Sequence, residues 1–174
     1  MKRLLYVLTF LVTVLSACKK DKINSVYDNS FEKWQAFKKQ SNNSYSYTAY
    51  RAYAFFAERT ETKITVKNGK VVQREFTMWS NQATGGGTPP SVVETWMENE
   101  DSLNTHDQLR AAETLTLDEI YAKAKKQWLN VSKKDNDVSF RTDNDGIISS
   151  AGYVSKGCQD DCFTGISIKD LKKL

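Results

Sequence analysis

Histidine and cysteine are scarce in this sequence: its 174 residues include one histidine, His106, and three cysteines. A zinc site needs about four Cys, His or carboxylate ligands at suitable spacings. We therefore expect no metal and no cofactor. A hydrolase needs a nucleophile or a metal together with a base, and His106 stands in the polar stretch Asn-Thr-His-Asp at 104–107. No catalytic residue is predicted from this pattern.

The chain also lacks a strong excess of charge of one sign. Its 25 Lys and Arg against 21 Asp and Glu give a formal net charge of +4, which falls by two without Lys2 and Arg3. This balance is not the signature of a nucleic-acid-binding protein, so we expect no nucleic-acid partner. The apolar run at 4–15 would reach only about 18 Å as a helix, against about 30 Å of membrane hydrocarbon. A permanent transmembrane helix is therefore not expected.

The amino terminus has the pattern of an export signal. Two basic residues precede the uncharged run, and small residues follow it. Residues 15–18, Leu-Ser-Ala-Cys, resemble the lipobox of bacterial lipoproteins, which implies cleavage before Cys18 and acylation of its thiol. Two or more acyl chains anchor a protein stably to a membrane. We predict a lipoprotein signal peptide at 1–17, a lipidated tether at 18–28 and a single domain at 29–174.

These features predict a location in the cell envelope, with the membrane as a partner through the lipid anchor. We expect the outer membrane, facing the periplasm, and surface exposure remains open because no sorting signal follows Cys18. Lipidation of Cys18 would leave Cys158 and Cys162, which enclose Gln-Asp-Asp. An oxidising compartment favours a disulfide between them. The competing reading as a redox or metal pair lacks the usual two-residue spacing and further ligands.

The first half of the domain is predicted to be a helix followed by strands. A helix opening at Asn29 or Ser30 carries Phe31, Trp34 and Phe37 at three-residue spacing. Residues 45–55 alternate as a strand with Arg51 among aromatic residues on one face. Asn-Gly at 68–69 between two alternating runs is a strong hairpin signal. The expected strands of this half are 45–55, 63–67, 70–80 and 91–99, with a loop at 81–90.

The second half repeats this order after a polar stretch at 100–114, which we expect to be a surface excursion. A helix is predicted at 116–128, because Thr116 and Glu119 form a capping box ahead of an apolar stripe. Strands at 138–142 and 147–154 are joined by an Asp-Asn-Asp-Gly turn, and 163–168 can add another strand. The fold class is thus α+β, an antiparallel sheet of about five to seven strands with two main helices packed on one face.

Several of these segments resemble an uncharacterised lipoprotein domain family. The resemblance is carried by Trp34 on the first helix, the tyrosine-rich Asn-Ser-Tyr-Ser-Tyr at 43–47, and the valine strand that ends in Asn-Gly-Lys at 68–70. It continues through the helix at 116–128 and the acidic pair at 160–161. The resemblance implies an envelope protein of this fold and brings no established activity.

Three classes of function are weighed for the domain. A non-enzymatic binding or interaction module is favoured, because the strands carry more aromatic residues than can all face inward. The candidate binding residues are Arg51, Tyr53, Trp79 and Trp96, and the partner would be an unknown protein, glycan or small-molecule ligand. One alternative is an envelope hydrolase, which is supported only by His106 and by the spacing of Glu94 and Glu98. The other is a structural accessory subunit of a membrane complex. Asp-Ser-Leu at 101–103 also resembles an O-glycosylation site.

Overall fold

The structure is a computed structural model that describes residues 22–53, 58–80, 90–106, 109–160 and 162–174. Cys18 with its lipobox, and all but the last residue of the predicted loop at 81–90, lie outside the described residues. Among the helices of the described ranges, none is long and apolar enough to cross a membrane.

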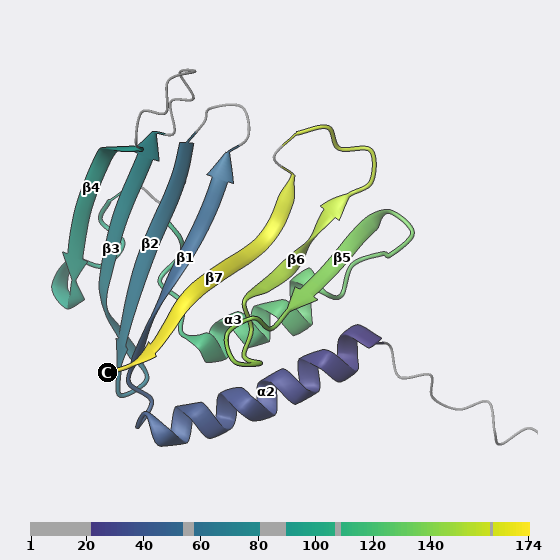
Figure 1. Cartoon of the computed structure of the whole chain (residues 1–174), viewed down its shortest axis with the longest axis horizontal. Coiled ribbons are helices and arrows are strands. Elements are labelled where there is room, and N and C mark those ends of the chain that lie inside the picture. The colour runs from purple at the N-terminus through teal and green to yellow at the C-terminus, as the bar shows by residue number, and fades with distance from the viewer. Residues whose placement is uncertain (1–21, 54–57, 81–89, 107–108, 161) are drawn as a thin grey trace, which may run out of the picture.

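A seven-stranded antiparallel sheet forms the body of the domain, in the order β4-β3-β2-β1-β7-β6-β5 (Figure 1). The first four strands form one meander and the last three form another. Antiparallel pairing of β1 with β7 joins the two meanders into one sheet. The strands are β1 Tyr45–Tyr53, β2 Glu58–Lys67, β3 Lys70–Ser80, β4 Ser91–Asn99, β5 Asn136–Arg141, β6 Ser150–Ser155 and β7 Phe163–Lys173.

Two helices, α2 (Lys22–Gln40) and α3 (Leu117–Lys123), pack against one face of this sheet (Figure 1). The predicted α+β class is therefore confirmed. Side chains alternate between the two faces of a strand. The face that carries Tyr45, Tyr47 and Arg51 is the one that the helices cover, and we call it the helix face.

The tight turns lie where the sequence predicts them. Asn68 and Gly69 both have positive φ, 49° and 79°, as a two-residue hairpin of this twist requires. The flanking strand β3 has the predicted bounds, and so has β4. Asp145 and Gly146 also adopt positive φ, 51° and 86°, in the second predicted turn. Strand β2 begins five residues earlier than predicted, and β7 ends five residues later.

The first helix is longer than predicted. It is already helical at Lys22, so residues 22–28, which we expected in the tether, belong to α2. The predicted start at Asn29 or Ser30 is wrong because these polar residues lie inside the helix. Ser30 is 1% exposed, and its hydroxyl lies 2.6 Å from the Tyr121 hydroxyl. The Ser30 hydroxyl therefore makes a buried hydrogen bond within the domain and does not cap the start of the helix.

The second helix begins as predicted at a capping box. Thr116 Oγ1 accepts a hydrogen bond from the Glu119 N–H, and the Glu119 carboxylate accepts one from the Thr116 N–H at 2.7 Å. After α3 the chain continues as a π-helical turn, Ala124–Trp128. Turns of this kind inside helices are rare and frequently lie at functional sites. The turn carries Trp128 toward the pocket described below.

The core lies between the helices and the helix face of the sheet. Tyr27 and Trp34 of α2 meet Tyr45 of β1 and Tyr121 of α3 in edge-on ring contacts, with centroids 5.1 to 5.6 Å apart. Buried hydroxyls in this cluster are hydrogen-bonded: Tyr45 accepts from the Leu117 N–H at 2.8 Å. The predicted stripes on the two helices therefore contribute to the core through Trp34, Tyr121 and Trp128, whereas Phe31 is 36% exposed.

Candidate functional site

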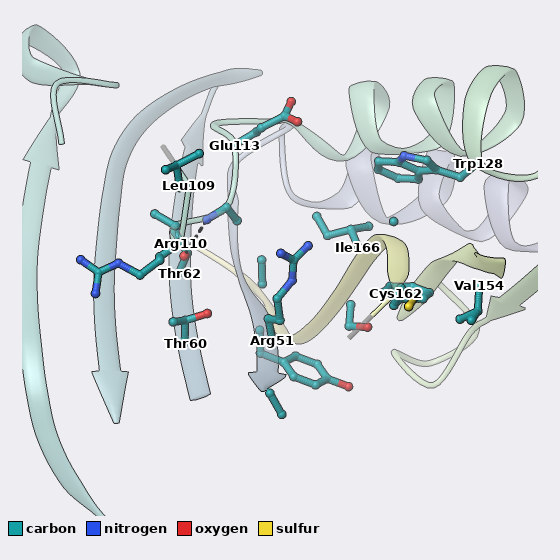
Figure 2. Close-up of a pocket in the computed structure, with 18 of the residues that line it drawn as sticks. Arg51, Thr60, Thr62, Leu109, Arg110, Glu113, Trp128, Val154, Cys162 and Ile166 are labelled. Atoms are coloured by element: carbon teal, nitrogen blue, oxygen red, sulfur yellow. Dashed lines mark hydrogen bonds between the residues drawn. The ribbon is translucent and has the colours of Figure 1, made fainter. Parts of the chain in front are cut away.

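A pocket of about 700 Å³ opens on the helix face of the sheet, beside the core (Figure 2). Small-molecule pockets typically measure about 300–1,000 Å³, with mostly apolar walls and a few polar groups. One wall is the segment 109–115, which we call the crossing segment. The other wall is the end of β6, the start of β7 and the disulfide loop between them. Strands β1 and β2 form the floor, and Trp128 closes one end.

The crossing segment is held to the sheet mainly through its backbone. The Ala112 N–H donates to Thr62 Oγ1 at 2.9 Å, and Tyr47 donates its hydroxyl hydrogen to the Leu115 carbonyl at 2.6 Å. Ala111 is 7% exposed in a small cluster with Phe76. In the second part of the predicted surface excursion at 100–114, Leu109, Arg110 and Glu113 are exposed as expected, whereas Ala111 is buried against the sheet. A segment held by its backbone needs no apolar period, so its sequence resembles that of a loop.

A buried ion pair between β3 and β4 contacts the backbone of the crossing segment. Arg74 on β3 and Glu98 on β4 are both 0% exposed and make two hydrogen bonds, at 2.8 and 2.9 Å. Arg74 also donates to the Ala112 carbonyl at 3.3 Å. The Glu98 carboxylate accepts further bonds from the backbone N–H groups of Asn104 and His106. Burial raises the pKa of Glu98, but the bonds from Arg74 and these N–H groups outweigh it and lower the pKa to about 2.

The residues considered for hydrolysis belong to this structural cluster. His106 stacks on Trp96 with ring centroids 4.7 Å apart, and its Nδ1 lies 3.2 Å from Glu98. Glu94 forms a separate ion pair with Arg110 at 3.0 Å. Glu94 and Glu98 are thus each engaged by an arginine. Neither His106 nor either glutamate lines the pocket.

The second wall contains the disulfide. Cys158 and Cys162 are bonded, with their Cα atoms 6.3 Å apart, as the sequence predicts. Both cysteines line the pocket, and so do Gln159 and Asp160 between them. The disulfide closes a short loop and so ties together the chain between β6 and β7 where it forms the rim. The pairing therefore has a structural role at the site.

The Arg51 side chain projects into the pocket from β1, between the crossing segment and Ile166 (Figure 2). It is exposed, and its guanidinium carbon lies 6.0 Å from the centre of the Tyr53 ring. Among the described residues, Arg51 has no hydrogen bond and no ion pair. Of the alternatives for this arginine, stacking on a tyrosine is thus observed and pairing with a carboxylate is not. Its guanidinium presents donors toward the cavity.

The other predicted binding residues are not brought into the pocket. Tyr53 lies beside Arg51 on β1 but does not line the cavity. Trp96 is on the helix face, stacked on Phe76 at 4.9 Å. Trp79 lies opposite Arg59 on the other face of the sheet, with the Arg59 guanidinium 5.0 Å from its ring centre. The four candidates therefore separate, and only Arg51 reaches the site.

Comparisons with protein-family models, with curated proteins and with solved structures gave no match. The described residues contain no group of three or more His, Cys, Asp or Glu side chains placed to hold a metal ion. The site is therefore interpreted from its own geometry. That geometry joins apolar side chains, one arginine with free donors and polar groups at the rim into a cavity suited to binding.

Proposed function

We propose that this protein is a non-enzymatic binding module of the bacterial cell envelope, anchored through Cys18, which holds a small-molecule ligand in the pocket on the helix face. The observation that carries the proposal is the composition of this cavity. Trp128, Ile166 and Leu115 supply apolar surface, and Arg51 supplies a cation with no hydrogen-bond or ion-pair partner among the described residues. Convergence of this kind is the usual mark of a ligand site.

The lining favours binding over hydrolysis. A hydrolase would place a nucleophile and a base within hydrogen-bond reach of one another. The described residues of the lining include no histidine, and both cysteines there are bonded to each other. The Glu113 carboxylate at the rim pairs with Lys123 at 2.6 Å. Among the described residues of the lining, no pair of groups is arranged as nucleophile and base.

Filling the pocket tests the proposal without knowledge of the ligand. Ile166→Trp adds a bulky ring to a pocket-lining position, whereas the control Val93→Trp makes a similar enlargement at a residue that is 53% exposed on β4. The full chain is purified from native membranes and its small-molecule extract is analysed by mass spectrometry. We expect a ligand in near-stoichiometric amount with the unaltered chain and with Val93→Trp, and at least a tenfold loss with Ile166→Trp. Equal amounts in all three, or no ligand in any, would contradict the proposal.

The anchor is tested separately at Cys18. We expect Cys18→Ser to abolish incorporation of labelled palmitate and to accumulate as the longer precursor, because the acylated thiol is needed before cleavage. Cys158→Ser is the matched control, since it removes a cysteine in the disulfide loop and should leave labelling unchanged. Gel mobility and fatty-acid labelling measure both effects. A processed Cys18→Ser chain that stays in the membrane would refute the anchor.

A further inference from the structure

Arg51 differs from Arg110, the other arginine that lines the pocket, in having no carboxylate partner among the described residues. Arg110 is held by Glu94, and its guanidinium points away from the cavity (Figure 2). Glu113 also lines the pocket and pairs with Lys123, which does not line it. Among the described residues that line the pocket, Arg51 is therefore the cation that a ligand can engage. Its planar fork of N–H donors matches a carboxylate bidentately.

The position of Arg51 on the sheet indicates that this is a binding geometry. Arg51 follows Tyr45, Tyr47 and Ala49 on the helix face, all of them buried, and pairs in register with Thr60. A core-facing position of this kind normally carries an apolar residue. The Arg51 guanidinium therefore lies at the boundary between the apolar core and the cavity. An anion at this point would gain charge-assisted hydrogen bonds in a partly desolvated site.

The rest of the lining limits what else the ligand can be. Trp128, Ile166 and Leu115 line the cavity, and all three belong to the hydrophobic core or pack against it. Glu113 and Asp160 bring two carboxylates to the lining, which disfavours a second negative charge on the ligand. At about 30 Å³ per atom of the size of water, about 700 Å³ has room for on the order of twenty such atoms. The cavity thus suits one anionic group on an apolar body of moderate length.

We propose that the pocket binds a monoanionic amphiphile, with its carboxylate on the Arg51 guanidinium and its apolar chain against Trp128 and Ile166. This inference rests on the proposed function, because it names the ligand class of the same pocket. The carboxylate accepts two N–H hydrogen bonds from Arg51, and the chain replaces water on the apolar wall. Charge selects the ligand, and apolar contact supplies the remaining affinity.

The test uses native membranes that carry the full chain and two photoreactive probes. One is a twelve-carbon carboxylate with a diazirine in its chain, and the other is the matching alcohol. After illumination, mass spectrometry measures labelling of the peptides that contain Trp128 and Ile166. We expect the carboxylate to label these peptides at least tenfold more than the alcohol. Excess dodecanoate should compete, whereas dodecanol should not.

Variants at Arg51 give the decisive comparison. Arg51→Gln should lower carboxylate labelling by about 10- to 100-fold, as expected for loss of hydrogen bonds to a charged group. Arg51→Lys should retain part of it, because a point charge replaces the bidentate fork. The control Arg59→Gln removes a cation from the opposite face of the sheet, where Arg59 lies over Trp79, and should leave labelling unchanged. Arg51 is exposed, so these variants should fold, which circular dichroism checks.

Failure of this inference is distinguishable from failure of the proposed function. Equal labelling by the two probes, with no effect of Arg51→Gln, would overturn the anionic ligand. So would absence of pocket labelling by either probe. In both cases the extraction experiment with Ile166→Trp still decides whether the pocket holds a small molecule, because it does not depend on the chemistry of the probes.

Discussion

Replacing Arg74 with methionine is expected to lower the free energy of unfolding by about 3–5 kcal/mol, the usual cost of removing one partner of a buried ion pair. Arg74 and Glu98 are both fully buried, so the variant leaves a carboxylate without its guanidinium. The variant also removes the hydrogen bond from Arg74 to the Ala112 carbonyl. Urea denaturation followed by far-ultraviolet circular dichroism measures the loss.

A matched control lies on the neighbouring strand. Lys63 pairs with Glu75 across β2 and β3 at 2.9 Å, but its side chain is 49% exposed. Exposed pairs of this kind contribute about 0–1 kcal/mol, so Lys63→Met should cost less than about 1 kcal/mol. The two substitutions change the same type of pair, and only burial differs. Similar losses in the two variants would show that Arg74 does not hold a buried charge.

The pH dependence supplies a second readout of the same pair. The pKa of Glu98 is lowered from an ordinary value of 4.5 to about 2 in the folded state. A lowered folded pKa stabilises the protein above the unfolded value, and this contribution is lost as the pH falls from about 4.5 to about 2. At about 1.4 kcal/mol per unit the loss is about 3 kcal/mol. Without Arg74 the pKa of Glu98 should rise, so the unfolding free energy should vary less with pH in this range.

Local sequence signals predict the elements of this fold but not how its two halves meet. Positive φ at Asn68 and Gly69 is a property of those residues, and so is the cap formed by Thr116 and Glu119. Such features depend on neighbours a few residues away, and they were predicted correctly. The pairing of β1 with β7 joins residues more than a hundred positions apart, such as Ala49 and Ile168. No periodicity in either strand identifies its partner.

The candidate site was only partly predictable for the same reason. Arg51 was identified because a charge among aromatic residues on one strand face is a local anomaly. The docking of the crossing segment on the sheet could not be predicted from the sequence. Its hydrogen bonds come from backbone groups, which every residue has, and their acceptor Thr62 is an ordinary strand residue. Trp128 was interpreted as core from its helical spacing, and it is buried. Trp128 also lines the cavity, and this role depends on the crossing segment and the disulfide loop, which form the two walls of the cavity.

Trp34 connects both helices to the sheet, and Trp34→Ala is expected to lower the free energy of unfolding by about 3–5 kcal/mol. Its ring is 0% exposed, with the Tyr45 ring centre 5.1 Å away, and its Nε1–H donates to Asp118 Oδ1 at 2.8 Å. Alanine removes the ring and leaves a cavity that the helices cannot fill without moving. Circular dichroism during urea denaturation measures the effect without depending on tryptophan fluorescence.

The neighbouring aromatic residue of the same helix separates packing from helix propensity. Phe31→Ala makes the same kind of change one turn earlier, at a residue that is 36% exposed, and should cost about 1–2 kcal/mol because less apolar surface returns to water. Trp34→Phe keeps a ring but loses the hydrogen bond to Asp118, and should fall between the two alanine variants. Since alanine favours a helix more than either aromatic residue, a loss at Trp34 no larger than that at Phe31 would mean that α2 is not docked through Trp34.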